Sequence, residues 1–199
     1  MYYANILTGG IGCGKSTTAR LLALHGFRIV DVDTIAHKAL EIARDNVVSV
    51  FGDEILETSN KERYISREKL GNIVFKDSNK KIELESILHP LIHQHITQEC
   101  EILEKKKSPY FIDIPLYFES KYEYKKRFVI CVYATRDMQI QRIQSRNNLS
   151  LEDIIKRVDS QIDIETKRKK SDFVIENTSD LKTLQSNIES FLQEFLGHY

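Results

Sequence analysis

The stretch GGIGCGKST at residues 9–17 carries the residue types that bind a polyphosphate. Gly9 to Ser16 match the pattern G-x-x-x-x-G-K-[ST] at every fixed position. Glycines let backbone N–H groups converge on an anion, and the free N–H groups at the start of a following helix add to the attraction. Lys15 supplies a mobile charge for the β- and γ-phosphates, and the Ser16 hydroxyl is a ligand for Mg²⁺. The stretch therefore predicts a site for a nucleotide polyphosphate with its magnesium ion.

Two carboxylates, Asp31 and Asp33, stand at the exit of the expected strand FRIVDVD, at the edge of the sheet where ligands gather in open α/β folds. Asp33 at this edge is suited to accept the proton of an acceptor hydroxyl or to orient that hydroxyl. Its position fits a helix cap equally well, because aspartate is a frequent N-cap residue. Position alone leaves both roles open.

A basic helical segment supplies candidate cations for a transferred phosphoryl group. Arg142 and Arg146 lie four residues apart on one face, with Arg136 upstream and Arg157 in the next expected helix. Such a face is either solvated or folded over the nucleotide as a cover that excludes water and neutralises charge. Beside a phosphate-binding loop, we favour the cover.

Apolar runs alternating with helical patterns predict a parallel sheet with helices on both faces, the α/β class. We expect strands in the five segments YYANILT, FRIVDVD, PYFIDIP, FVICVYA and DFVIEN. Asp31 and Asp33 would stand at the exit of the second of these strands.

Helical periodicity predicts the elements between the strands. We expect a helix at 34–51, a long one at 79–106 interrupted at His89–Pro90, and an amphipathic one at 179–197. Region 52–78 is more polar, and its helical pattern is broken. Ser66 within this region and Ser150 further along the chain are expected N-cap residues of helices. The apolar face of the last helix comprises Leu181, Leu184, Ile188, Leu192 and Phe195.

Composition limits the partners that the chain is expected to have. Its 199 residues carry a formal net charge of zero, which argues against a nucleic-acid partner. We expect the short basic clusters at 104–107, 124–127 and 167–170 to be solvated helix ends or turns. The N-terminus lacks the features of a signal peptide, no apolar run reaches the length of a membrane span, and three widely spaced cysteines fit a reducing compartment. We therefore expect a cytoplasmic monomer that has no membrane partner.

The sequence separates the classes of phosphate-loop protein. A guanine-nucleotide switch reads its base with N/T-K-x-D, which does not occur here. A hydrolytic motor ends its third strand with Asp-Glu, whereas Asp113 is followed by Ile114. A kinase that acts on a small molecule fits best, and whether Asp113 contacts Mg²⁺ stays open.

Several segments taken in order resemble the dephospho-CoA kinase family over nearly the whole chain. They are LTGGIGCGKST, VDVDTIAHKAL, LHPLI at 88–92, DIPLYFES at 113–120, QIQRIQSRNNLSLEDIIKRVDSQ and SDFVIENTSDL. The resemblance implies a single P-loop kinase domain over 1–199, with a five-stranded parallel sheet, a helical acceptor-binding region at about 34–106 and a lid at about 136–165. It also implies the reaction: ATP phosphorylates the ribose 3′-hydroxyl of dephospho-CoA, the last step of coenzyme A synthesis.

The resemblance also implies roles for individual residues. Asp33 would be the base, and Lys15 and Arg142 would stabilise the phosphoryl group in flight. Asn177 would lie near the adenine, and Ser16 would hold Mg²⁺. The ATP-binding residues would be Gly12, Cys13, Gly14, Lys15, Ser16, Thr17 and Arg146, and the acceptor would meet Asp33, His89, Pro115 and Leu116.

The chain departs from the family pattern at Cys13, Tyr117 and His93, where serine, leucine and arginine are usual. Cys13 is expected to be a small filler of the loop, although a helix N-terminus can lower a thiol pKa and invite oxidation. His89, His93 and His95 suggest a zinc site, but no H-E-x-x-H pattern is present. Two other functions stay open: a kinase of another small acceptor such as a nucleoside monophosphate, and a nucleotide-dependent binding module without transfer chemistry.

Overall fold

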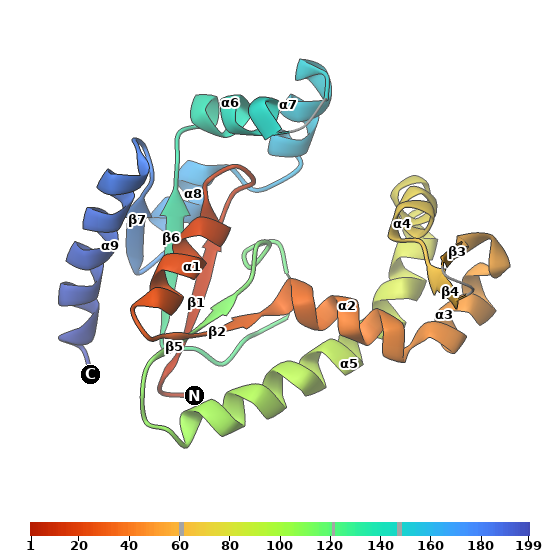
Figure 1. Cartoon of the computed structure of the whole chain (residues 1–199), viewed down its shortest axis with the longest axis horizontal. Helices are drawn as coiled ribbons and strands as arrows, with labels where there is room; N and C mark the ends of the chain where they lie inside the picture. The colour runs from red at the N-terminus through yellow and green to blue at the C-terminus, as the bar shows by residue number, and fades with distance from the viewer. Residues whose placement is uncertain (60–61, 121, 147–148) are drawn as a thin grey trace. The chain divides into compact units, whose positions relative to one another are not determined.

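The chain forms two compact units. The computed structural model describes residues 1–59, 62–120, 122–146 and 149–199. Met1–Asp31 and Cys100–Tyr199 make up the first unit, and Val32–Glu99 makes up the second. Figure 1 labels the helices and strands of both units along the chain.

The first unit is built on a parallel sheet whose strand order is β2-β5-β1-β6-β7. Every pair of neighbouring strands in it runs parallel, so the carboxyl ends of the strands meet at one edge. Asp31 and Asp113 are register partners at this edge. The sheet confirms the predicted fold class, and its strands are β1 (Ala4–Gly9), β2 (Arg28–Asp31), β5 (Tyr110–Asp113), β6 (Phe128–Tyr133) and β7 (Phe173–Glu176).

Helices cover both faces of this sheet. On one face α1 (Lys15–Leu24) and α9 (Leu181–Leu196) share a core with the strands, where the Phe111 and Phe195 rings lie 5.5 Å apart. On the other face the Tyr110 hydroxyl donates to Glu104 Oε1 of α5 (Ser78–Glu104) at 3.1 Å. The remaining helices of the first unit are α6 (Arg136–Arg146), α7 (Leu151–Asp159) and α8 (Ile164–Lys169).

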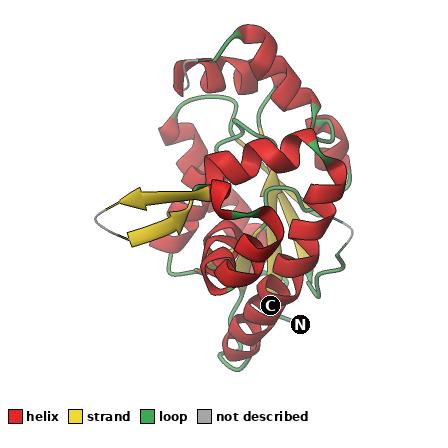
Figure 2. Ribbon diagram, turned by 90° about the vertical axis from the view of Figure 1, so that its right-hand side faces the viewer, coloured by secondary structure: helices red, strands yellow, loops and turns green. Residues whose placement is uncertain are grey.

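The second unit is helical with one hairpin and has its own apolar core. It comprises α2 (Val32–Ile42), α3 (Arg44–Phe51), a 3₁₀ turn (Asp53–Ile55), β3 (Leu56–Ser59), β4 (Glu62–Ile65), α4 (Arg67–Lys76) and the first part of α5. Figure 2 shows β3 and β4 as a pair of antiparallel strands. Buried side chains from α2, α3, β4 and α4, among them Leu40, Val47, Ile65 and Leu70, form the core.

Several predicted elements differ in the structure. The helix expected at 34–51 is two helices, because Ala43 separates α2 from α3. α2 begins at Val32, so Asp33 lies in its first turn and not on the strand. The hairpin within 52–78 was not predicted, because strands of only four residues carry too short a pattern.

The expected interruption at His89–Pro90 is wrong, because α5 continues through Pro90. A proline in a helix interior costs about 3 kcal/mol relative to alanine. Leu84, Ile87, Leu88 and Leu91, on both sides of Pro90, pack on the core of the second unit. This packing offsets the lost hydrogen bond and keeps one helix. The predicted N-caps are confirmed, since Ser66 Oγ accepts from Lys69 N and Ser150 Oγ from Asp153 N.

Within the described residues, no helix is both long and apolar enough to cross a bilayer. The apolar face expected on the last helix is confirmed for Leu184, Ile188, Leu192 and Phe195, which are buried. Leu181 differs, because it is 56% exposed at the start of α9.

This difference gives a stability test. We expect Phe195→Ala to lower the free energy of unfolding by about 3–5 kcal/mol, because its fully buried ring stacks on the core. Leu181→Ala on the same helix should change it by less than about 0.5 kcal/mol. Urea unfolding followed by circular dichroism measures both values, and equal losses in the two variants would contradict the burial seen here.

Candidate active site

The loop between β1 and α1 has the backbone that an anion cradle needs. Gly12 and Gly14 have φ of 79° and 87°, a left-handed conformation that side chains with a Cβ rarely adopt. Gly14 is also the N-cap residue of α1, where no side chain in the described residues caps the helix. Thr17 N donates to Gly14 O at 3.0 Å, so the N–H groups of Lys15 and Ser16 are the ones offered to a ligand, together with the positive end of the helix dipole.

Side chains from distant segments hold the carbonyl groups of this loop. Gln139 Nε2 on α6 donates to Ile11 O at 2.6 Å, and Asn177 Nδ2 donates to Cys13 O at 2.8 Å. Gln161 Oε1 accepts from Ile11 N at 2.9 Å. Gln139 and Asn177 are buried, at 3% and 8% exposure, so these hydrogen bonds are shielded from water. The loop is thus held in shape before any nucleotide arrives.

The backbone of Gln139 and the side chain of Asn177 explain why two loop positions must be glycine. A Cβ on Gly12 would lie 2.8 Å from the Gln139 carbonyl oxygen, and one on Gly14 would lie 2.2 Å from Asn177 Nδ2. Both distances are shorter than the contacts that Cβ atoms make in real proteins. Close packing and positive φ therefore select glycine independently at these positions.

Lys15 forms an ion pair with Asp113 at the end of β5. Both side chains are nearly buried, with 12% and 10% of their surface exposed. The sequence left the role of Asp113 open, and here it orients the cation of the loop. A bound polyphosphate would compete with this carboxylate for Lys15.

Hard oxygen donors suited to Mg²⁺ come from neighbouring elements of the first unit. Ser16 is exposed in the first turn of α1, and Asp31 and Asp113 end adjacent strands in register. Hydroxyl and carboxylate oxygens are the ligands that Mg²⁺ prefers, together with phosphate oxygens. The residues present therefore fit the ion.

Arg142 lies against the loop as well. Its guanidinium donates to Gly12 O at 3.4 Å and to Asn177 O at 2.9 Å. Arg146, one turn further along α6, is exposed. Arg136 pairs with Asp159 at 2.8 Å and so ties α6 to α7. The predicted lid spans both helices, and its residues 147–148 lie outside the described residues.

A buried ion pair between Lys167 and Glu119 was not predicted from the sequence. Lys167 is fully buried, and its Nζ lies 2.7 Å from Glu119 Oε1. The expectation that the cluster 167–170 is solvated is therefore wrong at Lys167. The same Glu119 oxygen accepts from Ile162 N at 2.9 Å, next to Gln161. Charge patterning cannot reveal this pair, because 48 residues separate its partners in sequence.

Two further predicted site residues follow β5. Pro115 O accepts from the Thr8 hydroxyl at 3.3 Å, which joins the segment after β5 to β1. Leu116 is 47% exposed and so is available to a ligand.

Cys13 is fully buried in the loop, in agreement with its expected role as a filler. Burial raises the pKa of its thiol, and hydrogen bonds from the Gly10 and Ala134 backbone oppose the rise only in part. The alternative of a pKa lowered by the helix N-terminus is wrong, because desolvation is the larger effect.

The second unit holds Asp33 and His89. Both side chains are exposed, Asp33 in the first turn of α2 and His89 in the middle of α5. The His89 ring lies 5.7 Å from that of His93, whose pKa is lowered by burial and then by His89. The described residues contain no group of three or more His, Cys, Asp or Glu side chains placed to hold a metal ion.

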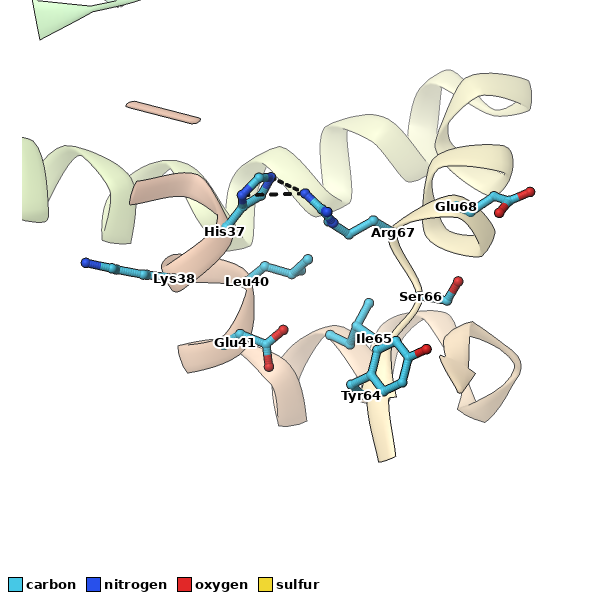
Figure 3. Close-up of a pocket in the computed structure, with 9 residues that line it drawn as sticks. All are labelled: His37, Lys38, Leu40, Glu41, Tyr64, Ile65, Ser66, Arg67 and Glu68. Atoms are coloured by element: carbon cyan, nitrogen blue, oxygen red, sulfur yellow. Dashed lines mark hydrogen bonds between the residues drawn. The ribbon is translucent and has the colours of Figure 1, made fainter. Parts of the chain in front are cut away.

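A pocket of about 580 Å³ lies in the second unit between α2 and the segment that joins β4 to α4. Figure 3 shows that Arg67 and His37 point toward each other at this pocket. His89 is not among its lining residues. Arg67 and His37 are not among the site residues predicted from the sequence, although His37 lies within the segment VDVDTIAHKAL that resembles the family.

The parallel sheet, the phosphate loop and its flanking helices define a P-loop kinase fold. Shikimate kinase from Acinetobacter baumannii, solved in complex with shikimate, shares this fold with a TM-score of 0.54 at 15% identity, over 100% of this chain and 95% of that one.

Closer relatives define the family. The sequence model for dephospho-CoA kinase matches residues 5–183. Dephospho-CoA kinase from Helicobacter pylori is 44% identical over 192 residues, which is 96% of each chain. The solved dephospho-CoA kinase from Campylobacter jejuni is 37% identical with a TM-score of 0.78, over 100% of both chains. The chain belongs to the dephospho-CoA kinase family.

The hydrogen bonds to the loop carbonyls lead to a binding test. We expect Gln139→Leu to raise the dissociation constant for ATP about 3- to 10-fold, because Ile11 O loses its buried donor. Gln141→Leu, at an exposed position of the same helix, should leave it unchanged. Isothermal titration with ATP measures both constants. Unchanged affinity in Gln139→Leu would mean that the hydrogen bond does not hold the loop.

The buried thiols lead to a reactivity test. Burial also raises the pKa of Cys131, to about 12, and all three cysteines are buried thiols. Because a raised pKa keeps a thiol protonated at pH 7, we expect labelling of native Cys13 and Cys131 to be at least about tenfold slower than after unfolding. A chromogenic disulfide reagent measures the rates, and Cys13→Ser assigns them. Rapid labelling that this substitution removes would contradict the burial of Cys13.

Proposed function

We propose that this chain transfers the γ-phosphoryl group of ATP to the ribose 3′-hydroxyl of dephospho-CoA, forming CoA and ADP. Membership of the dephospho-CoA kinase family over residues 5–183 carries the proposal. The complete phosphate loop, with Lys15 already oriented by Asp113, supports it from the site.

Asp33 is the proposed general base. Its carboxylate is exposed in the first turn of α2, so a ligand can reach it. A carboxylate that accepts the proton of the attacking hydroxyl strengthens the nucleophile and orients it toward the phosphorus. The alternative role of Asp33 as the N-cap of α2 is wrong, because the helix begins at Val32 and Asp33 lies inside its first turn.

Lys15 and Arg142 are the proposed electrostatic partners of the transferring group. Little covalent chemistry is required of the protein in phosphoryl transfer, so positioned cations supply most of the stabilisation. The position of Arg142 against Gly12 O supports its role near the phosphates. Residues 12–17 would bind the ATP phosphates through backbone N–H groups, with Arg146 as a further cation and Asn177 on the adenine side.

Mg²⁺ is the proposed metal, held by the Ser16 hydroxyl and by phosphate oxygens. The ion would neutralise the phosphate charge and align the leaving group when bound. Asp31 and Asp113 would accept hydrogen bonds from its water ligands or coordinate it directly. The protein itself keeps these oxygens at one edge of the sheet.

Regions 34–106 and 136–165 are the proposed acceptor-binding region and lid. His89, Pro115 and Leu116 remain proposed acceptor contacts, and the exposure of His89 and Leu116 is compatible with that role. Lid closure would exclude water from the transfer step. A cytoplasmic monomer is proposed as well, and light scattering after gel filtration tests its oligomeric state.

Substitution of Asp33 tests the proposal. We expect Asp33→Asn to lower kcat about 10²- to 10⁴-fold, with ATP binding retained, because the amide cannot accept the proton. Asp45→Asn, in the exposed first turn of α3, is the matched control and should keep full activity. A coupled assay with Mg-ATP and dephospho-CoA measures kcat. Wild-type activity that is equal or higher on AMP, CMP or shikimate would overturn the proposed acceptor.

A further inference from the structure

The pocket of the second unit has the size and lining of a small-molecule site. Its volume of about 580 Å³ lies within the range of about 300–1,000 Å³ that ligand pockets occupy. Leu40 and Ile65, which also belong to the core of this unit, give the pocket an apolar part. Charged side chains surround that apolar part, and no role in the reaction has been assigned to them above.

Arg67 lines the pocket, and none of the ion pairs among the described residues includes its guanidinium. It donates instead to His37, with Nη1 3.5 Å from Nδ1 and closer to Nε2. Because a guanidinium cannot accept a hydrogen bond, the facing imidazole nitrogen must be the unprotonated one. An imidazole satisfies only one of five guanidinium N–H groups, so Arg67 can still bind an anion through a two-pronged contact.

The spacing of Asp33 and His37 along α2 gives the separation between the proposed base and the residue that contacts Arg67. Asp33, His37 and Glu41 are spaced four residues apart, so all three lie on one face of the helix. Four residues advance roughly 6 Å along a helix axis. The width of one ribose ring separates its 3′-hydroxyl from the phosphate on its 5′ carbon, and that separation is comparable with one such step.

We propose that Arg67 and His37 bind the diphosphate of the acceptor, one helical turn from the hydroxyl that Asp33 activates. This inference rests on the proposed function, because dephospho-CoA carries a diphosphate on the 5′ carbon of the ribose that is phosphorylated. A phosphate oxygen would replace the imidazole as the hydrogen-bond acceptor of Arg67. This contact would supply binding energy for the acceptor in the ground state and the transition state alike.

The rest of the lining fits the arm that extends from the diphosphate. Leu40 and Ile65 match its methyl groups, and the Glu41 carboxylate can accept hydrogen bonds from its amide N–H and hydroxyl groups. Figure 3 shows Lys38 and Glu68 extending away from the centre of the pocket in opposite directions. These two opposite charges therefore leave Arg67 as the cation that faces the ligand.

Titration with dephospho-CoA in the absence of ATP tests the inference. We expect Arg67→Ala to raise the dissociation constant about 10- to 100-fold, the loss expected for hydrogen bonds to a charged group. Arg67→Lys should give an intermediate loss, because it keeps the charge and removes the planar fork. Arg63→Ala removes an exposed arginine of the same unit that is paired with Asp53, so it is the matched control and should change the constant less than about twofold.

Steady-state kinetics separates this inference from the proposed function. In Arg67→Ala, KM for dephospho-CoA should rise while KM for ATP and kcat at saturating acceptor stay within about threefold of wild type. Unchanged affinity for dephospho-CoA, or an equal loss of affinity for ATP, would overturn the role of Arg67. Failure of the wild-type protein to phosphorylate dephospho-CoA would instead overturn the proposed function.

Discussion

When the backbone N–H groups of a loop point at a bound anion, the carbonyl groups of the same peptide units point into the protein. These carbonyl groups then need hydrogen-bond donors of their own. Each peptide unit carries one donor and one acceptor, and a buried acceptor without a partner is costly. In this protein Gln139, Arg142 and Asn177 donate to three successive carbonyls of the loop. The cradle after β1 therefore depends on α6 and on the residue that follows β7. The phosphate site is a property of the whole first unit and not of its motif alone.

Asp113 provides the electrostatic counterpart of this arrangement. It is buried at the end of β5 and pairs with Lys15, while its strand register places Asp31 beside it. The cation of the loop is thus compensated when no nucleotide is bound, which limits the cost of holding it in a nearly buried place. Arrival of a polyphosphate exchanges one anionic partner for another, so the charge of Lys15 is neutralised in both states.

Local patterns were sufficient to predict the sheet, the loop and most helices. The phosphate loop has fixed residues at fixed spacing, and five apolar strands separated by helices leave few other folds. The two-strand hairpin was not foreseen, since each strand has only four residues. The continuous helix through Pro90 depends on apolar packing within the second unit, which a local rule about proline does not include. Gln139, Gln161 and Lys167 were missed for a related reason, because their partners lie far away in sequence.

The ion pair between Lys167 and Glu119 constrains which amino-acid substitutions can be accepted during evolution at these two positions. Loss of either partner alone leaves a charge without compensation in the interior, which typically costs about 3–5 kcal/mol. Glu119 also accepts from Ile162 N, beside the glutamine that holds the phosphate loop. A single substitution that removes the charge of Lys167 or of Glu119 should therefore be selected against. Related chains with a neutral residue at one of these positions should carry a neutral residue at the other as well. The residue types at the two positions should therefore covary among relatives.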